Sequence, residues 1–130
     1  MKLYEVLYVS TIAPDAPVSV VANIARTARA FNAAHDITGL LIFDGQRFCQ
    51  QLEGSQKDVL ALMERIQKDT RHVNVEVVHH GLLALRRFRD FAMGFTLLDD
   101  VDLLGPLEKM DGEAALNSFT AMLPTLDIFS

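Results

Sequence analysis

The segment from Asp36 to Gly54 constrains the fold of this chain more than any other. Two apolar runs flank the dipeptide Asp44-Gly45. An Asp-Gly pair between such runs predicts a tight hairpin turn, because both central residues of that turn adopt positive φ. We therefore expect two antiparallel strands joined by a two-residue loop at Asp44-Gly45.

The second strand of this hairpin carries an amide on an apolar face. Side chains alternate between the faces of a strand, so Phe48, Gln50 and Leu52 point the same way. A two-residue loop pairs Gln50 with Gly39 and leaves space beside the amide. Two interpretations stay open: Gln50 bonds a neighbouring backbone group in a core, or it contacts a ligand.

Length, charge and cysteine content limit the classes of protein. At 130 residues we expect a single folded unit with its own core. A net charge of −5 argues against a nucleic-acid partner, and no apolar run is long enough to cross a membrane. The N-terminal residues are typical of a strand rather than a signal peptide. The one cysteine fits a reducing compartment, so we expect a cytoplasmic location.

The order of predicted elements gives the fold class. We expect strands at 2–10 and 36–54 (the hairpin), 72–82 and 91–97, and helices at 18–34, 56–68 and about 112–122. The first six elements form the ferredoxin-like βαββαβ pattern, an α+β fold with both helices on one face of the sheet. A fifth strand and a C-terminal helical tail follow. We assign residues 1–98 to the ligand-binding domain and 99–130 to an extension that covers the bare face of the sheet or meets a partner.

Polar residues on the two central helices have two interpretations each. Ile24, Ala28 and Asn32 follow one another at spacing four and form one stripe of the first helix. Asn32 therefore either caps the end of that helix or faces inward. Arg65 and Asp69, also four apart, are typical of a surface ion pair.

The usual signatures of catalysis are missing from the sequence. The four histidines lack a metal-ligand spacing, Cys49 is typical of a structural thiol, and no phosphate loop or nucleophile elbow occurs. We find no paired carboxylates at an inward position. What remains is a set of inward polar groups, Tyr8, Asn32 and Gln50, joined by Met93. These groups predict a hydrogen-bonding pocket for a planar, amide-rich ligand, and no enzyme activity.

The pattern of motifs resembles the BLUF family, the blue-light sensors that use FAD, over about residues 2–98. The matching residues are Leu7-Tyr8-Val9-Ser10, Phe31-Asn32, Ile37-Thr38-Gly39, Phe48, Gln50, Leu52-Glu53-Gly54, Arg65 with Asp69, Arg71-His72, Asn74-Val75, Arg87-Phe88 and Met93. Any one of these motifs alone is weak, and their combination is specific.

The resemblance implies a cofactor and a site. A flavin would lie between the two helices, as FAD, although FMN or riboflavin would use the same ring contacts. The resemblance implies that Gln50 bonds the reactive edge of the ring, that Asn32 holds its pyrimidine end and that Tyr8 bonds Gln50. It also implies that Ile24, Phe48 and Ile66 pack on the ring, with Arg65 and Asp69 toward the ribityl and phosphate side.

The resemblance also implies a function. Light would drive electron and proton transfer from Tyr8 and a rearrangement of the hydrogen bonds of Gln50. Met93 and the tail would carry the change to an unidentified downstream protein, and we expect a homo-oligomer.

One position departs from the family pattern. Many members carry Trp two residues before the methionine, where this chain has Phe91 and no Trp at all. We therefore expect that Tyr8→Phe abolishes the photocycle with no side route. The alternatives are a ferredoxin-like enzyme of the acylphosphatase type, which the absence of arginine in the loop 11–17 disfavours, and a ligand-binding regulatory module that does not respond to light.

Overall fold

The main element of this computed structural model is a six-stranded sheet. The structure describes residues 2–17, 19–89, 91–96, 104, 106–123 and 126–129, and only the main chain of 91–96, 108 and 126–129. The elements are β1 (Leu3–Ile12), α1 (Ser19–Ala34), β2 (Thr38–Phe43), β3 (Arg47–Ser55), α2 (Gln56–Lys68), β4 (His72–Leu83), β5 (Phe91–Thr96), the 3-10 helix η1 (Pro106–Lys109), α3 (Gly112–Met122) and β6 (Leu126–Phe129).

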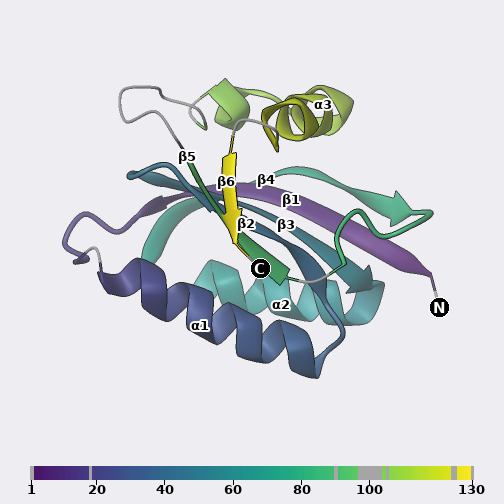
Figure 1. Cartoon of the computed structure of the whole chain (residues 1–130), viewed down its shortest axis with the longest axis horizontal. Coiled ribbons are helices and arrows are strands. Elements are labelled where there is room, and N and C mark those ends of the chain that lie inside the picture. Colours follow the sequence, from purple (N-terminus) through teal and green to yellow (C-terminus); the bar gives the residue numbers. More distant parts are fainter. Residues whose placement is uncertain are drawn as a thin grey trace.

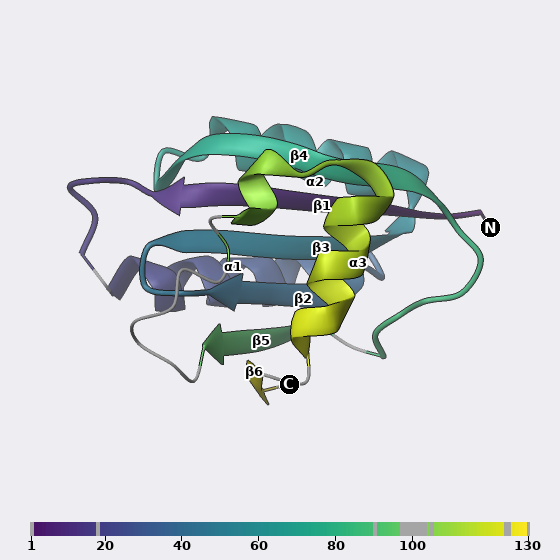
Figure 2. The ribbon, with the colours of Figure 1, turned by 90° about the horizontal axis from the view of Figure 1, so that it is seen from above.

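The strand order confirms the ferredoxin-like prediction. The sheet runs β4-β1-β3-β2-β5-β6, and its first four strands pair antiparallel. The added strand β5 pairs parallel with β2, and β6, which the sequence did not predict, pairs antiparallel with β5. Helices α1 and α2 cover one face of the sheet, while η1 and α3 lie on the other, with α3 running across the strands (Figures 1 and 2).

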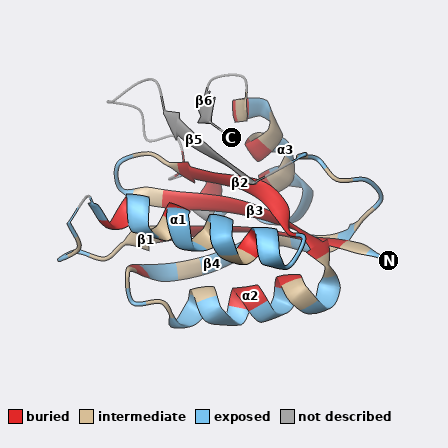
Figure 3. Ribbon diagram, turned by 60° about the horizontal axis from the view of Figure 1, so that its bottom comes forward, coloured by how far each residue is buried: buried red, intermediate tan, exposed pale blue. Residues whose placement is uncertain are grey.

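Each face of the sheet has its own apolar core. Buried Tyr4, Val6 and Tyr8 of β1 pack on the side of α2, whereas Leu7 and Val9 pack on the side of α3. Period-two alternation predicts Tyr4, Val6 and Tyr8 on one face of this strand and Leu7 and Val9 on the other, and the structure confirms it. The helices expose their outer faces to solvent, and buried residues fill β2 and β3, whereas β4 is largely intermediate or exposed (Figure 3).

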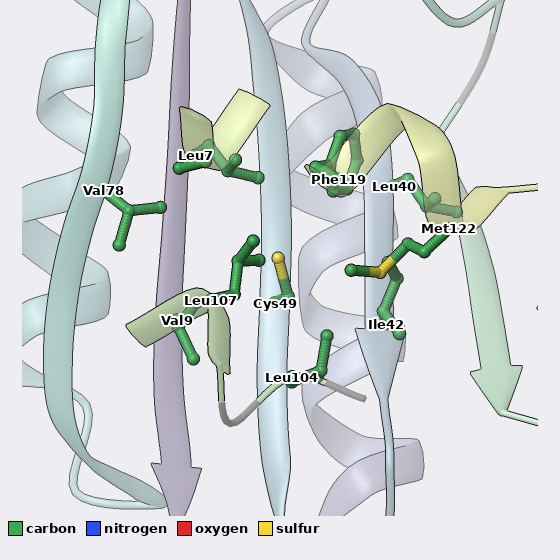
Figure 4. Packing of buried hydrophobic residues seen from close by; sticks show 11 residues of the cluster. Leu7, Val9, Leu40, Ile42, Cys49, Val78, Leu104, Leu107, Phe119 and Met122 are labelled. Atoms are coloured by element: carbon green, nitrogen blue, oxygen red, sulfur yellow. The ribbon is translucent and has the colours of Figure 1, made fainter. Parts of the chain in front are cut away.

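Helix α3 covers the face that the βαββαβ pattern leaves open. Its Ala115, Phe119 and Met122 are buried against strand residues that include Cys49 and Leu40 (Figure 4). The predicted bounds of this helix are confirmed. Asp111 occupies the N-cap position, but its side chain makes no capping hydrogen bond. The proposed domain boundary at residues 98 and 99 lies outside the described residues.

The register of the hairpin corrects the sequence prediction. Gln50 pairs with Leu41, and Gly39 pairs with Leu52. The turn is centred one residue later than predicted, because the Asp44 carboxylate accepts bonds from the main-chain N–H of Gln46 and Arg47 at 3.0 and 2.7 Å. Both registers place the same residues on the same face of the sheet. The predicted face of Gln50 is therefore correct, and its predicted cross-strand partner Gly39 is wrong.

Gly39 is required for a different reason from the one that the sequence suggested. Its φ is +151°, and a Cβ there would lie 1.9 Å from the carbonyl oxygen of Gln51. The glycine therefore permits a close approach of β2 to β3 and makes no space beside Gln50.

Period-two alternation predicts Val73, Val75 and Val77 on one face of the strand at 72–82, against Asn74, Glu76 and Val78, and this prediction is wrong over part of β4. Val73 and Val77 are 36% and 42% exposed, whereas Val78 is 4% exposed. The pairing of β4 with β1 shifts register at two places, and Asn74 has a φ of 54°. Such bulges insert unpaired residues and re-aim the side chains that follow.

Candidate functional site

A cavity of about 370 Å³ lies between α1, α2 and the sheet. Its size falls in the range of small-molecule and cofactor sites. Residues from β1, β3, both helices and the segment after α2 line it: Tyr8, Ile24, Thr27, Ala28, Phe31, Asn32, Gln50, Leu62, Arg65, Ile66, Lys68, Asp69, Arg71 and His72.

Tyr8 and Gln50 form a buried hydrogen-bonded pair at the floor of the cavity. They are direct partners across β1 and β3, each 3% exposed, and the Tyr8 hydroxyl donates to Gln50 Oε1. Burial raises the pKa of Tyr8 far above its ordinary value, and the charges of Cys49 and Asp69 add to this effect. The phenol therefore keeps its proton at neutral pH, which makes it the donor of this bond.

Asn32 presents an amide that has no partner in the described structure. The residue is 0% exposed, and neither Nδ2 nor Oδ1 of its side chain has a hydrogen-bond partner. Its carbonyl oxygen accepts from Ile37 N at 2.8 Å, which closes the end of α1 around Asp36 at a φ of 54°. The side chain thus does not cap the helix and lines the cavity instead, so the capping interpretation is wrong.

His72 is fixed on a third side of the cavity. Its Nε2 lies 2.9 Å from the Ile66 carbonyl oxygen, and its Nδ1 lies 2.8 Å from Ser10 Oγ. A carbonyl only accepts, so Nε2 carries a proton; in the neutral ring, Nδ1 then accepts from Ser10. The ring meets Tyr8 edge-on at a centroid distance of 6.3 Å.

Charged residues border the cavity beside α2. Asp69 accepts a forked bond from Arg71, at 2.9 and 3.0 Å from Nε and 2.6 Å from Nη2. These bonds hold the pKa of Asp69 below its ordinary value. Arg65 instead lies over the ring of Phe31, at 4.3 Å from its centroid. The partner of Asp69 is thus Arg71, not Arg65 as the sequence spacing suggested.

The cavity brings together most of the predicted site residues. Tyr8, Ile24, Asn32, Gln50, Arg65, Ile66 and Asp69 all line it. Phe48 does not: it is 1% exposed and packs with Val20, Val21, Ala25 and Leu41. For Met93 the main chain is described, and it pairs with Leu41, the partner of Gln50. The side chains of Phe91 and Met93 lie outside the described part of the chain.

Several lining residues were missed, and some of them carried a signal. Ala28 lies between Ile24 and Asn32 in the predicted stripe of the first helix, and Leu62 precedes Ile66 by four residues in the second. Arg71 lies in the turn between α2 and β4 and His72 begins β4, and no periodicity marks either residue as inward.

The opposite face of the sheet corrects another prediction, since it holds paired inward carboxylates. Glu5 and Glu53 are direct partners across β1 and β3 and are 3% and 0% exposed. Gln51 Nε2 lies 3.3 Å from Glu5 Oε1 and 3.1 Å from Glu53 Oε2. Within the described residues, no group of three metal-binding side chains comes together.

Comparisons with known proteins agree with this geometry. The profile of the family described as "Sensors of blue-light using FAD" (BLUF) matches residues 3–94. The chain belongs to the BLUF family.

Two curated proteins are similar to part of the chain. The chain is 34% identical over 86 residues to the blue light- and temperature-regulated antirepressor BluF of Escherichia coli, covering 66% of this chain and 21% of the relative. It is 45% identical over 63 residues to photoactivated adenylate cyclase subunit beta of Euglena gracilis, covering 48% of this chain and 7% of the relative. The matches thus span about a fifth of these relatives or less.

A solved BLUF structure has the same architecture. The structure of BlrB, a BLUF protein in its dark state, matches with a TM-score of 0.71 and 28% identity over 94% of this chain and 98% of that one. In the described part of this chain, none of the helices is long and apolar enough to span a membrane.

The residues around the cavity fit a flavin. The isoalloxazine ring is flat and largely apolar, and its pyrimidine end offers carbonyl acceptors and an N–H donor. Ile24 and Ile66 supply apolar walls, and the unpartnered Asn32 amide supplies one donor and one acceptor. Without such a ligand the burial of the Asn32 amide costs free energy, because its donor and acceptor lose their bonds to water. A flavin that bonds this amide would remove that cost.

Proposed function

We propose that this chain is a blue-light receptor that binds a flavin between α1 and α2, and that the Tyr8–Gln50 hydrogen bond is its switch. The observation that carries the proposal is the buried Asn32 amide, which has no partner in the described part of the chain and lies in the same cavity as that hydrogen bond. Membership of the BLUF family supports the ligand class.

When bound, a flavin absorbs blue light and becomes a strong oxidant. Tyr8 is a neutral phenol that can give up an electron and a proton, and its only described hydrogen-bond partner is Gln50 Oε1. The Gln50 amide has an acceptor oxygen and a donor nitrogen, so turning it over reverses its bonds without moving the backbone. Each altered hydrogen bond changes the free energy by about 0.5–1.5 kcal/mol, enough to bias a bistable element.

FAD is the flavin that we propose, and Asn32, Gln50, Ile24 and Ile66 would hold its ring. The cations Arg65, Lys68 and Arg71 border the cavity with the single carboxylate of Asp69 among the lining residues. This balance favours a flavin that carries phosphate over riboflavin.

The output is the second half of the proposal. Tyr8, Gln50, Leu41 and Met93 are successive main-chain partners across β1, β3, β2 and β5. We assign Met93 and the C-terminal extension to transmission, with an unidentified downstream protein as receiver and a homo-oligomer as the assembled state. The chain itself acts as a sensor and not as an enzyme, and the single cysteine supports a cytoplasmic location.

The test is an absorption spectrum of the flavin-loaded protein in the dark and after blue light. We expect flavin bands that move slightly to the red and then relax, and no movement in Gln50→Leu. Gln67→Leu, an exposed glutamine of α2, is the matched control and should behave as wild type. A protein that stays colourless after refolding with FAD would end the proposal.

A further inference from the structure

The buried carboxylates Glu5 and Glu53 accept hydrogen bonds from the same short segment after β4. Each of their four oxygens accepts two hydrogen bonds, and residues 87 and 88 supply four of the eight. Arg87 Nε and Nη2 donate to Glu5 at 2.9 and 3.2 Å. The main-chain N–H groups of Arg87 and Phe88 donate to Glu53 at 2.9 and 2.8 Å.

Arg86 attaches the same segment to two further elements. Its Nη1 donates to Thr38 Oγ1 at 2.8 Å and to the Glu53 carbonyl at 3.2 Å. Its Nη2 donates to the Asp36 carbonyl at 3.0 Å, in the turn that follows the end of α1. Residues 86–88, which we name the arginine segment, therefore bind β1, β2, β3 and the end of α1 together.

Removal of the arginine segment would leave two buried carboxylates side by side with only four of their eight hydrogen bonds, those from Thr38, Gln51 and His79. Like charges directly opposite across a sheet repel, and an unpaired buried charge is strongly unfavourable. Arg87 is thus the counter-ion of Glu5, and the main-chain N–H groups of the segment stabilise Glu53, so the segment allows both carboxylates to be buried.

The arginine segment also contacts α3. The Phe88 ring packs against the apolar core under α3 and meets Phe119 edge-to-face at a centroid distance of 6.5 Å. On the sheet side, Gln51 bonds both carboxylates and directly follows Gln50 of the cavity. The Gln51 Oε1 atom has no hydrogen-bond partner in the described structure, whereas its Nε2 donates to both carboxylates, so the amide links the two glutamates directly to the strand that carries Gln50.

We propose that Glu5, Glu53 and the arginine segment form a latch that holds α3 on the sheet, and that a rearrangement at Gln50 reaches α3 by loosening it. These residues are positioning residues and touch no lining residue of the cavity through the bonds described. The latch itself stands on the contacts above, and its coupling to light rests on the proposed function.

The first test needs no light. Hydrogen exchange of the α3 amides is measured in the full chain for wild type, Arg87→Met and Arg89→Met. Arg87→Met removes the charged bonds to Glu5, and we expect α3 amides to exchange at least about tenfold faster. Arg89 is exposed and directly follows the arginine segment, so its substitution should leave the exchange of the α3 amides unchanged. Equal exchange in the two variants would overturn the latch.

A second variant guards against misfolding of the first. Phe88→Leu keeps the main-chain donor to Glu53 and removes the ring contact with Phe119, so α3 amides should exchange a few times faster while the amides of α1 keep the wild-type rate. A change spread equally over α1 and α3 would indicate general destabilisation and overturn the inference.

The light arm separates the two proposals. In flavin-loaded wild type, light should accelerate α3 exchange; in Arg87→Met the absorption shift should remain while the light-dependent part of α3 exchange disappears. A wild-type absorption shift without any response of α3 would overturn the coupling and leave the receptor function standing. The absence of any absorption shift in wild type would refute the receptor function, and the dark exchange rates would still decide the latch.

Discussion

Gln50 and Gln51 are neighbours on β3 and have opposite surroundings. Gln50 faces the cavity, where the Asn32 amide has no partner among the residues that the structure describes. Gln51 faces Glu5 and Glu53, where every carboxylate oxygen accepts two bonds from the chain itself. On the Glu5–Glu53 face the chain itself thus satisfies both carboxylates, and within the described residues only Gln51 Oε1 lacks a partner there, whereas both polar atoms of the Asn32 side chain lack one on the cavity face.

This difference separates polar groups that fold the chain from polar groups that serve a function. Burial raises the pKa of Glu5, but the bonds from Arg87, Gln51 and His79 outweigh burial and leave that pKa below its ordinary value. The charged form of Glu5 is therefore built into the fold. No comparable compensation exists for Asn32 within the described residues, so its free energy cost remains until something binds.

The largest effect should come from Glu53→Ala. The substitution leaves the donors Thr38 Oγ1, Gln51 Nε2 and two main-chain N–H groups without their acceptor in a buried layer. We expect a loss of about 3–5 kcal/mol in the free energy of unfolding, measured by urea denaturation. Glu64→Ala, at an exposed position of α2, should change that free energy by less than about 0.5 kcal/mol. A loss below about 1 kcal/mol in Glu53→Ala would show that the bonds from the chain itself do not stabilise this carboxylate.

Asn32→Leu should increase the free energy of unfolding of the ligand-free protein, the opposite of the effect of Glu53→Ala. It replaces an unpartnered buried amide by an apolar side chain of similar size, so the free energy of unfolding should rise by about 1–2 kcal/mol. Flavin affinity, measured by fluorescence titration, should fall at least about tenfold because the pyrimidine end loses its partner. Asn23→Leu on the exposed side of α1 is the control. A clear loss of stability without flavin would contradict the contrast between the faces.

The smallest effect concerns Asp69 at the edge of the cavity. Arg71 lowers its pKa in the folded protein, so its stabilising contribution is present above the unfolded pKa and is lost as pH falls through the folded value. Because the pair is partly exposed, Asp69→Asn should cost less than about 1 kcal/mol at pH 7, and the cost should be smaller at about pH 3, below the ordinary pKa of the carboxyl. Unfolding free energies at the two pH values test this, and an equal cost at both would assign the effect to something other than charge.

The sequence predicts the faces of the sheet well and the partners across it poorly. Period-two alternation placed Tyr8 and Gln50 on one face, because one face of each strand is buried against helices. The Asp44 carboxylate moved the turn by one residue, and hairpin patterns do not encode that local bond. The partners of Glu53 and Glu5 come from Arg87, 34 and 82 positions further along, and no spacing rule reaches so far.

The site divides in the same way. Helical spacing predicted Ile24 and Asn32 as one stripe, and both line the cavity. Phe48 shares the face of Gln50 but packs against α1 outside the cavity. Residues at different positions along one strand face contact different parts of the helices that cover the sheet. Arg71 and His72 line the cavity because the turn between α2 and β4 directs the chain past it. The path of that turn depends on the tertiary fold and has no local sequence pattern.

The light-induced absorption shift of Tyr8→Phe, compared with that of Tyr4→Phe, tests the central claim most directly. Both tyrosines lie on the same face of β1 and each donates or shares one side-chain hydrogen bond, Tyr8 with Gln50 and Tyr4 with His80 at 2.5 Å. Since the chain has no tryptophan, Tyr8→Phe should bind flavin and show no red shift, whereas Tyr4→Phe should keep the wild-type shift. A red-shifted lit state in Tyr8→Phe would contradict the account that the Tyr8–Gln50 pair is the switch.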